Sequence, residues 1–122
     1  MKHLYRGFDY FHACKEDEMK YRVVERIPSW QEYNHLWKTV GWRFHEREVV
    51  EESLLKSQYC VCALTKTGIV GMARVVGDDR LTHYIQDAIV IPECQGYGIG
   101  AAMMEKIMAH KNSVGLMASA AG

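Results

Sequence analysis

The sequence predicts a single domain that combines helices with a mixed β-sheet, in the α+β (mixed α/β) class. Two short turns, at residues 66–68 and 77–80, separate three strand-like runs, which gives an antiparallel meander. A strand, a glycine loop, a helix and another strand follow, as in a βαβ unit with a parallel strand pair. With 122 residues, 48% of them hydrophobic, the chain is long enough to bury one core.

The N-terminal half divides into an extension and the start of the domain. Residues 1–18 form the extension, which ends in a charged run, and the domain covers 19–122. A first strand is expected at 21–27, where Pro28 stops it. A helix begins at Ser29, because Ser29 and Glu32 have the spacing of a capping box. Its apolar face consists of Trp30, Tyr33, Trp37 and Val40.

The second half alternates strands and helices around one loop. A second helix is expected near residues 45–57. The expected strands are 58–65, 69–76, 81–91 and 114–117, and Pro92 ends the third. From Ile99 to His110 the apolar spacing becomes helical. These elements predict a partly splayed sheet with helices on both of its faces.

The composition argues against several classes of function. The formal net charge is zero and no basic stripe is present, so neither nucleic acid nor a membrane is an expected partner. The N-terminus lacks an apolar signal core, which predicts a cytoplasmic protein. Cys60 and Cys62 alternate along a strand without a matching Cys/His pair, so buried free thiols are favoured over a metal site.

Three glycines, Gly96, Gly98 and Gly100, lie between the last long strand and the helix. Free N–H groups at such a helix start suit an anion such as a pyrophosphate. Gly96, Gly98 and Ala101 also fit the dinucleotide fingerprint G-x-G-x-x-[G/A]. That fingerprint follows its strand directly and needs an acidic residue further on, and both features are missing here.

The run Gln95-Gly96-Tyr97-Gly98-Ile99-Gly100 resembles the Q/R-x-x-G-x-G/A motif of the GNAT superfamily of N-acetyltransferases. The segments 40–42, 75–78, 84–87 and 91–92 are also similar to small bacterial members. The resemblance implies a GNAT-like fold that binds acetyl-CoA as cosubstrate, through a bulged strand and the glycine loop. The residues implied are Ile89, Val90, Ile91, Gln95, Gly96, Tyr97, Gly98, Ile99, Gly100 and Ala101.

The resemblance further implies an N-acetyltransferase in which a primary amine of an unidentified acceptor attacks the thioester directly. Asp87 is the candidate base, because it interrupts an apolar strand where a carboxylate is costly unless it is paired. The alternative is a structural role, with Asp87 bonded to backbone or to a cation such as Arg74. His83, Tyr84 and Glu93 are weaker candidates.

The C-terminus departs from the family pattern. Members usually continue past the strand at 114–117 with a helix and a strand pair, including a tyrosine that protonates the leaving thiolate, and this chain stops at Gly122. The C-terminal part is therefore expected to be truncated. Either residues 1–14 or a twin subunit in a homodimer is expected to cover the gap. A catalytically weak or inactive CoA-binding module is the alternative to an active enzyme.

Overall fold

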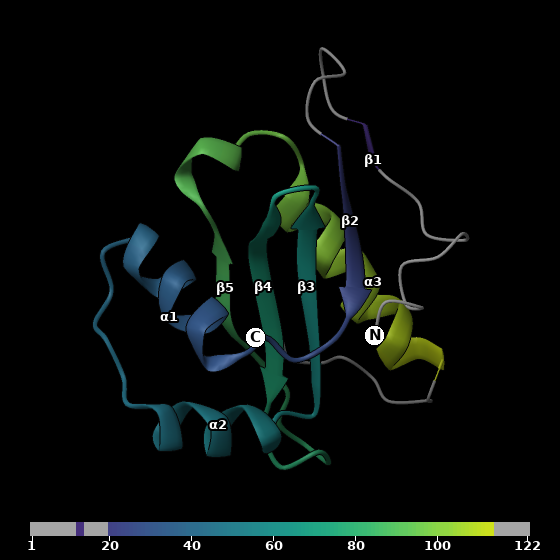
Figure 1. The fold of residues 1–122 in the computed structure, drawn as a ribbon. Coiled ribbons are helices and arrows are strands. Elements are labelled where there is room, and N and C mark those ends of the chain that lie inside the picture. The colour runs from purple at the N-terminus through teal and green to yellow at the C-terminus, as the bar shows by residue number, and fades with distance from the viewer. Residues whose placement is uncertain (1–11, 14–19, 114–122) are drawn as a thin grey trace.

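The computed structural model describes residues 12–13 and 20–113. Over these residues, five strands form one antiparallel sheet in the order β1-β2-β3-β4-β5, flanked by helices (Figure 1). The elements are β1 (His12–Ala13), β2 (Lys20–Glu25), α1 (Trp30–Thr39), α2 (Arg47–Leu55), β3 (Tyr59–Thr65), β4 (Gly68–Val76), β5 (Tyr84–Val90), the 3-10 turn η3 (Pro92–Cys94) and α3 (Ile99–Ser113). The predicted mixed fold is confirmed. The predicted strand at 114–117, and with it the parallel pair, lies outside the described residues.

The helices cover both faces of the sheet, as the sequence predicts (Figure 1). Helix α3 packs on one face against β3 and β4, and α1 packs with α2 on the other. Gly71 shows how closely α3 approaches, because a Cβ placed there would lie 3.5 Å from Met103 Cε. The largest fully buried side chains include Leu36, Leu54, Met72, Ile99, Met103 and Ile107. The core therefore has two layers, one on each side of the sheet.

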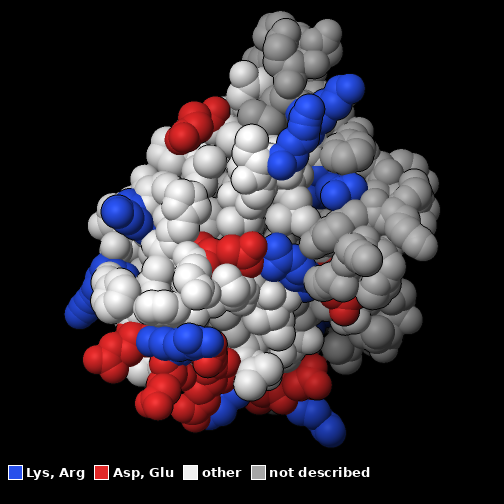
Figure 2. All heavy atoms as spheres, in the orientation of Figure 1, with Lys and Arg blue, Asp and Glu red and all other residues white. Residues whose placement is uncertain are grey.

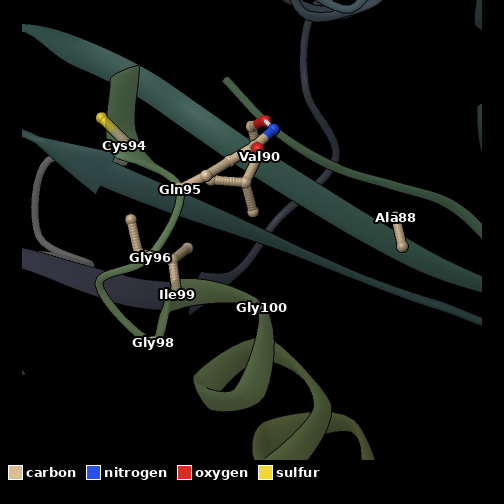
Figure 3. Close-up of a pocket in the computed structure, with 8 residues that line it drawn as sticks. All are labelled: Ala88, Val90, Cys94, Gln95, Gly96, Gly98, Ile99 and Gly100. Atoms are coloured by element: carbon tan, nitrogen blue, oxygen red, sulfur yellow. Dashed lines mark hydrogen bonds between the residues drawn. The ribbon is translucent and has the colours of Figure 1, made fainter. Parts of the chain in front are cut away.

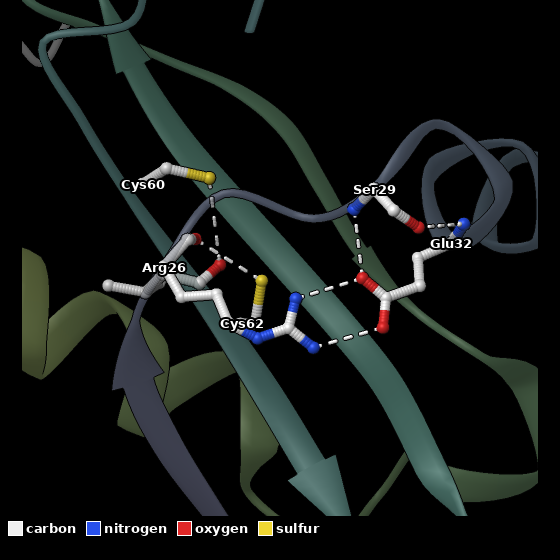
Figure 4. A network of polar contacts seen from close by, with 6 residues as sticks. Arg26, Ser29, Glu32, Cys60 and Cys62 are labelled. Atoms are coloured by element: carbon white, nitrogen blue, oxygen red, sulfur yellow. Dashed lines mark hydrogen bonds and ion pairs between the residues drawn. The ribbon is translucent and has the colours of Figure 1, made fainter. Parts of the chain in front are cut away.

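The start of α1 confirms the predicted capping box (Figure 4). The Ser29 hydroxyl accepts the Glu32 N–H at 3.1 Å, and the Glu32 carboxylate accepts the Ser29 N–H at 2.9 Å. Arg26 then donates to both oxygens of Glu32, at 2.8 and 2.9 Å. Polar side chains thus satisfy N–H groups that the first turn of a helix leaves free.

The strand predicted at 81–91 begins only at Tyr84, so its predicted start was wrong. The Asp78 carboxylate accepts the N–H groups of Arg80, Leu81 and Thr82, each at 2.9 Å. Those N–H groups are held in the turn and cannot enter the sheet.

Strand β5 carries a bulge against β4. Met72 lies opposite Ile89, and Arg74 lies opposite Gln86, so two steps along β4 match three along β5. The extra residue falls where Asp87 has a φ of 57°, in the left-handed region. A bulge of this kind bends its strand and interrupts pairing with the neighbour.

The two edges of the described sheet differ. His12 pairs with Tyr21, so β1 adds to β2 at the edge opposite β5. These two residues belong to the predicted N-terminal extension, and the rest of residues 1–18 lies outside the described part. Strand β5 forms the other edge, next to the glycine loop.

Three of the four cysteines are described, and all three are buried free thiols. The Cys62 thiol donates to the Arg26 carbonyl at 3.3 Å. A hydrogen bond with Cys60, and burial, raise the pKa of the Cys62 thiol above its ordinary value. Within residues 12–13 and 20–113, no group of three or more His, Cys, Asp and Glu is placed to hold a metal ion. No helix in that part of the chain is long and apolar enough to cross a membrane.

Candidate functional site

A pocket of about 330 Å³ lies between the end of β5 and the start of α3 (Figure 3). Both elements contribute to it, together with the glycine loop that joins them. Its lining residues are Ala88, Val90, Cys94, Gln95, Gly96, Gly98, Ile99 and Gly100. The volume lies at the small end of the range for ligand sites, roughly 300–1,000 Å³, and suits a diphosphate with part of an attached chain.

Two glycines give the loop its shape. Gly96 has a φ of 89° and Gly98 a φ of 85°, a backbone conformation that other residues adopt only with strain. A Cβ added at Gly96 or at Gly100 would meet no atom within 4 Å, so the space above both is open. The loop therefore lets a ligand approach its backbone closely.

The N–H groups of this loop are available to a ligand. Helix α3 makes its first hydrogen bond from the Ala102 N–H to the Gly98 carbonyl, at 3.0 Å. Among the described residues, no backbone hydrogen bond uses the N–H of Gly96, Gly98 or Gly100. Because α3 is 15 residues long, its dipole adds partial positive charge at the same place. Free N–H groups and a helix dipole at one place are the features that suit an anion.

The strand side of the pocket offers one more donor. The Ile91 N–H donates to the Val70 carbonyl at 2.9 Å, so strand alternation turns the N–H and carbonyl of Val90 away from β4. The Gln95 amide donates to the Val90 carbonyl at 2.9 Å. The Val90 N–H is then the backbone donor that points from this edge toward a ligand in the pocket.

The structure brings together six of the ten predicted cosubstrate residues as lining residues. These are Val90, Gln95, Gly96, Gly98, Ile99 and Gly100. The side chains of Ile89 and Ile91 point into the core instead, 2% and 8% exposed. Tyr97 and Ala101 belong to the same loop and helix start but do not line the pocket.

Two lining residues, Ala88 and Cys94, were not predicted. Ala88 reaches the pocket because it follows the bulge, which no local sequence pattern marks. Cys94 reaches it because η3 folds back, with the Cys94 N–H donating to the Ile91 carbonyl at 2.9 Å. Pro92 at the start of that turn was the available signal.

The predicted base, Asp87, lies at the bulge but does not line this pocket. Its Oδ2 accepts from Arg74 Nε at 2.8 Å and from the Tyr33 hydroxyl at 2.9 Å. Burial, and then the charge of Asp87, raise the pKa of Tyr33 above its usual range, so its hydroxyl stays protonated and donates. This arrangement matches the structural alternative, in which Asp87 pairs with Arg74.

The weaker candidates lie elsewhere. His83 is buried, with Nδ1 3.0 Å from the Gln58 amide oxygen and 3.1 Å from Lys111 Nζ. Tyr84 and Glu93 are exposed on the surface. None of the three lines the pocket between β5 and α3.

A second pocket, of about 540 Å³, lies beside α1 and the segment that joins it to α2. Trp42 and Phe44 are 44% and 66% exposed, and both line it. The other lining residues are Asn34, His35 and Lys38. Figure 2 shows no continuous basic area on the described part of this face of the molecule, and acidic side chains gather below, over α2.

The comparisons with known proteins agree with this geometry. The profile of the Acetyltransferase (GNAT) family matches residues 13–121. The chain therefore belongs to the GNAT family of acetyltransferases, and the dinucleotide alternative is set aside. An acyltransferase class for the protein follows from this membership.

Solved structures support the same assignment. A probable acetyltransferase from methicillin-resistant Staphylococcus aureus is 31% identical with a TM-score of 0.71, covering 77% of this chain and 71% of that one. A GNAT family protein from Streptococcus pneumoniae is 30% identical with a TM-score of 0.64, covering 73% and 66%. A Brucella melitensis member solved with acetyl-CoA shares the fold, at 15% identity and a TM-score of 0.59, covering 79% and 71%.

One curated relative matches over a shorter stretch. Chloroplastic serotonin N-acetyltransferase 2 of rice is 38% identical over 47 residues, which is 38% of this chain. The matched stretch spans about a quarter of that relative's length, 24%.

Proposed function

We propose that this protein is an N-acetyltransferase that transfers the acetyl group of acetyl-CoA to a primary amine by direct attack. The observation that carries the proposal is the set of glycine N–H groups without backbone partners at the start of α3, beside the exposed edge of β5. A diphosphate at the loop would accept from Gly96, Gly98 and Gly100. A chain leading from it would run along the edge that Val90 presents.

The residues fit this cosubstrate in shape as well as in charge. The open space above Gly96 and Gly100 leaves room for phosphate oxygens next to the backbone. The Gln95 side chain binds the Val90 carbonyl and so holds the loop against the strand. When bound, acetyl-CoA supplies the activated acetyl group, and the chain's own backbone N–H groups orient it.

The role of Asp87 as general base stays a prediction from the sequence. Its side chain is 3% exposed and paired with Arg74, which favours a positioning role. The pH–rate profile of Asp87→Asn separates the two roles, because only the loss of a base removes a limb of the profile.

Acetyl-CoA turnover with a panel of amines tests the proposal. Release of the free thiol in the presence of one amine supports it. Saturable CoA binding without thiol release under any amine supports the alternative, a CoA-binding module without catalysis. The panel starts with serotonin, which the rice relative's name specifies, and with other arylalkylamines, because Trp42 and Phe44 line a pocket beside α1. Polyamines and peptide N-termini complete it.

The variant Gly98→Ala tests the glycine loop. We expect acetyl-CoA affinity to fall by about tenfold or more, because alanine strains the left-handed backbone that aims the loop's N–H groups. Gly41→Ala is the matched control, because Gly41 has a φ of 78° and open space around it but lies at the end of α1. Equal affinity losses in the two variants, measured by calorimetry, would contradict the assignment of the loop.

A cytoplasmic location and a homodimer are further proposals. The part of the β5 edge before the bulge, residues 84–86, does not line the pocket and is unpaired within the described sheet, which supports pairing with a second copy there. Light scattering after gel filtration measures the mass in solution and tests the dimer. Fractionation of cells that express the tagged protein tests the location.

A further inference from the structure

Asp87 belongs to a buried polar cluster that joins the sheet to α1 and α2. The side chains of Arg74 and Asp87 are 8% and 3% exposed, and Arg74 Nε lies 2.8 Å from Asp87 Oδ2. The Tyr33 hydroxyl, from α1, donates to the same oxygen at 2.9 Å. A buried carboxylate with two donors is held firmly in place, because removing Arg74 leaves its charge unpaired and removing the Tyr33 hydroxyl takes away a hydrogen bond that buried surroundings do not replace.

Arg74 extends this cluster to α2. Its Nη1 donates to the Ser53 carbonyl at 3.1 Å and to the Ser57 hydroxyl at 3.0 Å. The planar guanidinium therefore holds Asp87 on one side and the end of α2 on the other, which an ammonium group could not do with the same geometry. We call Tyr33, Arg74 and Asp87 the bulge clamp.

Within the clamp, Tyr33 and Arg74 bind Asp87, which is the one non-glycine residue of the described strands with a positive φ. Asp87 has a φ of 57° and lies where the β5 bulge inserts its extra residue. Aspartate enters this conformation more readily than most residues do, as in turns, but in the middle of a buried strand its surroundings must hold it there. Asp79 is the other described non-glycine residue with positive φ, 65°, and it lies in an exposed turn.

The bulge decides what faces the pocket. Ala88 and Val90 follow it directly, and both line the pocket beside the glycine loop. A slip of one residue in β5 would turn these side chains to the other face of the sheet. The register of β5, and with it the direction of the Val90 N–H, therefore depends on the conformation at Asp87.

We propose that Tyr33 and Arg74 are positioning residues that act through Asp87 to hold the β5 bulge, and so set the strand edge of the acetyl-CoA pocket. The inference rests on the proposed function for its ligand. Within it, the Asp87 carboxylate anchors the bulge and does not remove the substrate proton.

The first test compares two buried tyrosines. Tyr33→Phe removes the hydroxyl from the clamp, and Tyr59→Phe removes one from a tyrosine that stacks on His110 against α3. We expect Tyr33→Phe to weaken acetyl-CoA binding by about threefold to tenfold, in line with usual coupling effects. It should also speed amide hydrogen exchange at Ile89 and Ile91, whereas Tyr59→Phe changes neither. Wild-type affinity and exchange in Tyr33→Phe would overturn the inference.

The second test separates an anchor from a base. Asp87→Gly removes the carboxylate, but glycine adopts the positive φ without strain. Asp87→Ala removes the carboxylate and also strains the backbone at this φ. Asp79→Gly is the matched control, because Asp79 also has a positive φ. If Asp87 is an anchor, the affinity for acetyl-CoA falls more in Asp87→Ala than in Asp87→Gly, and the limbs of the pH–rate profile stay where they are. If Asp87 is the base, both variants lose kcat by roughly 10²- to 10⁴-fold, keep wild-type affinity and lose a limb of the profile, which contradicts the inference.

The two levels of the proposal fail differently. If the wild-type protein binds no acetyl-CoA, the proposed function is contradicted. The role of the clamp is then still tested by comparing the amide exchange rates at Ile89 and Ile91 between wild type and Tyr33→Phe. A wild-type protein that binds acetyl-CoA, with Tyr33→Phe and Asp87→Ala binding equally well, contradicts the clamp alone. Arg74→Lys adds a conservative variant. We expect it to bind acetyl-CoA about tenfold more weakly, because a lysine ammonium cannot bind Asp87 and the end of α2 at the same time as the planar guanidinium does.

Discussion

Two of the arginine–carboxylate pairs in the described residues join separate parts of the fold, and they differ in geometry and in burial. Arg26 and Glu32 meet at the start of α1 with two parallel hydrogen bonds, and their side chains are 16% and 30% exposed (Figure 4). Arg74 of β4 and Asp87 of β5 meet through a single carboxylate oxygen, and their side chains are 8% and 3% exposed. The first pair has the better bidentate geometry, and the second has the greater burial.

Burial rather than geometry decides what each pair does. Water solvates the Arg26–Glu32 pair when either partner is lost, so the cost of breaking it is small. The interior offers Arg74 and Asp87 no such replacement, so breaking that pair leaves an uncompensated buried charge. The difference teaches that the clamp fixes the fold at the pocket, whereas the partly buried Arg26–Glu32 pair supports a helix cap.

The largest expected effect comes from truncating the two arginines in turn. Arg74→Met should lower the free energy of unfolding by about 3–5 kcal/mol, because Asp87 stays buried without its partner. Arg26→Met should cost about 1 kcal/mol or less. Urea unfolding of both variants measures the difference, and similar losses would break the comparison.

A smaller effect is expected from acid titration of the Arg26–Glu32 pair. The Arg26 guanidinium holds the pKa of Glu32 below its ordinary value of 4.5, against the opposing effect of burial. Because the folded pKa is lowered, the carboxylate stabilises the fold above the unfolded pKa, and this is lost as pH falls through the folded pKa. Thermal melts of wild type and Glu32→Gln should therefore differ at pH 7 and converge below pH 4.5. A gap that stays constant down to pH 3 would contradict this assignment.

The smallest effect concerns Asp78, where no cation is involved. Backbone N–H groups of residues 80–82 hold the pKa of this exposed carboxyl below its usual range. Asp78→Ala should lower the melting temperature less than Glu32→Gln does, since water replaces the lost acceptor. A larger drop than in Glu32→Gln would show that the turn before β5 controls the strand more than either ion pair suggests.

Local patterns predicted the elements that local chemistry determines. The capping box at Ser29 and the position of the glycine loop between a strand and a helix were both predicted correctly, because each depends on residues a few positions apart. The start of β5 was wrong because the side chain of Asp78 competes with strand pairing for nearby N–H groups. Single turns of this kind are decided by one side chain and leave no periodic signal.

Contacts between distant residues were harder to predict. Arg74 was named as a partner for Asp87, but Tyr33 was assigned only to the apolar face of its helix, and it lies 54 positions from Asp87. The bulge was expected from the family resemblance, whereas its position, and hence the lining role of Ala88, needed the register of β4 and β5. The sequence therefore predicted the residues of the glycine loop that line the pocket better than those of its strand edge.

Amide chemical shifts measured by NMR during an acetyl-CoA titration test the central claim most directly. The account predicts saturable shifts at Gly96, Gly98, Gly100 and Val90, larger than those at Gly41 on the far end of α1. Saturable binding that leaves these four amides unmoved, or no binding at all, would contradict it.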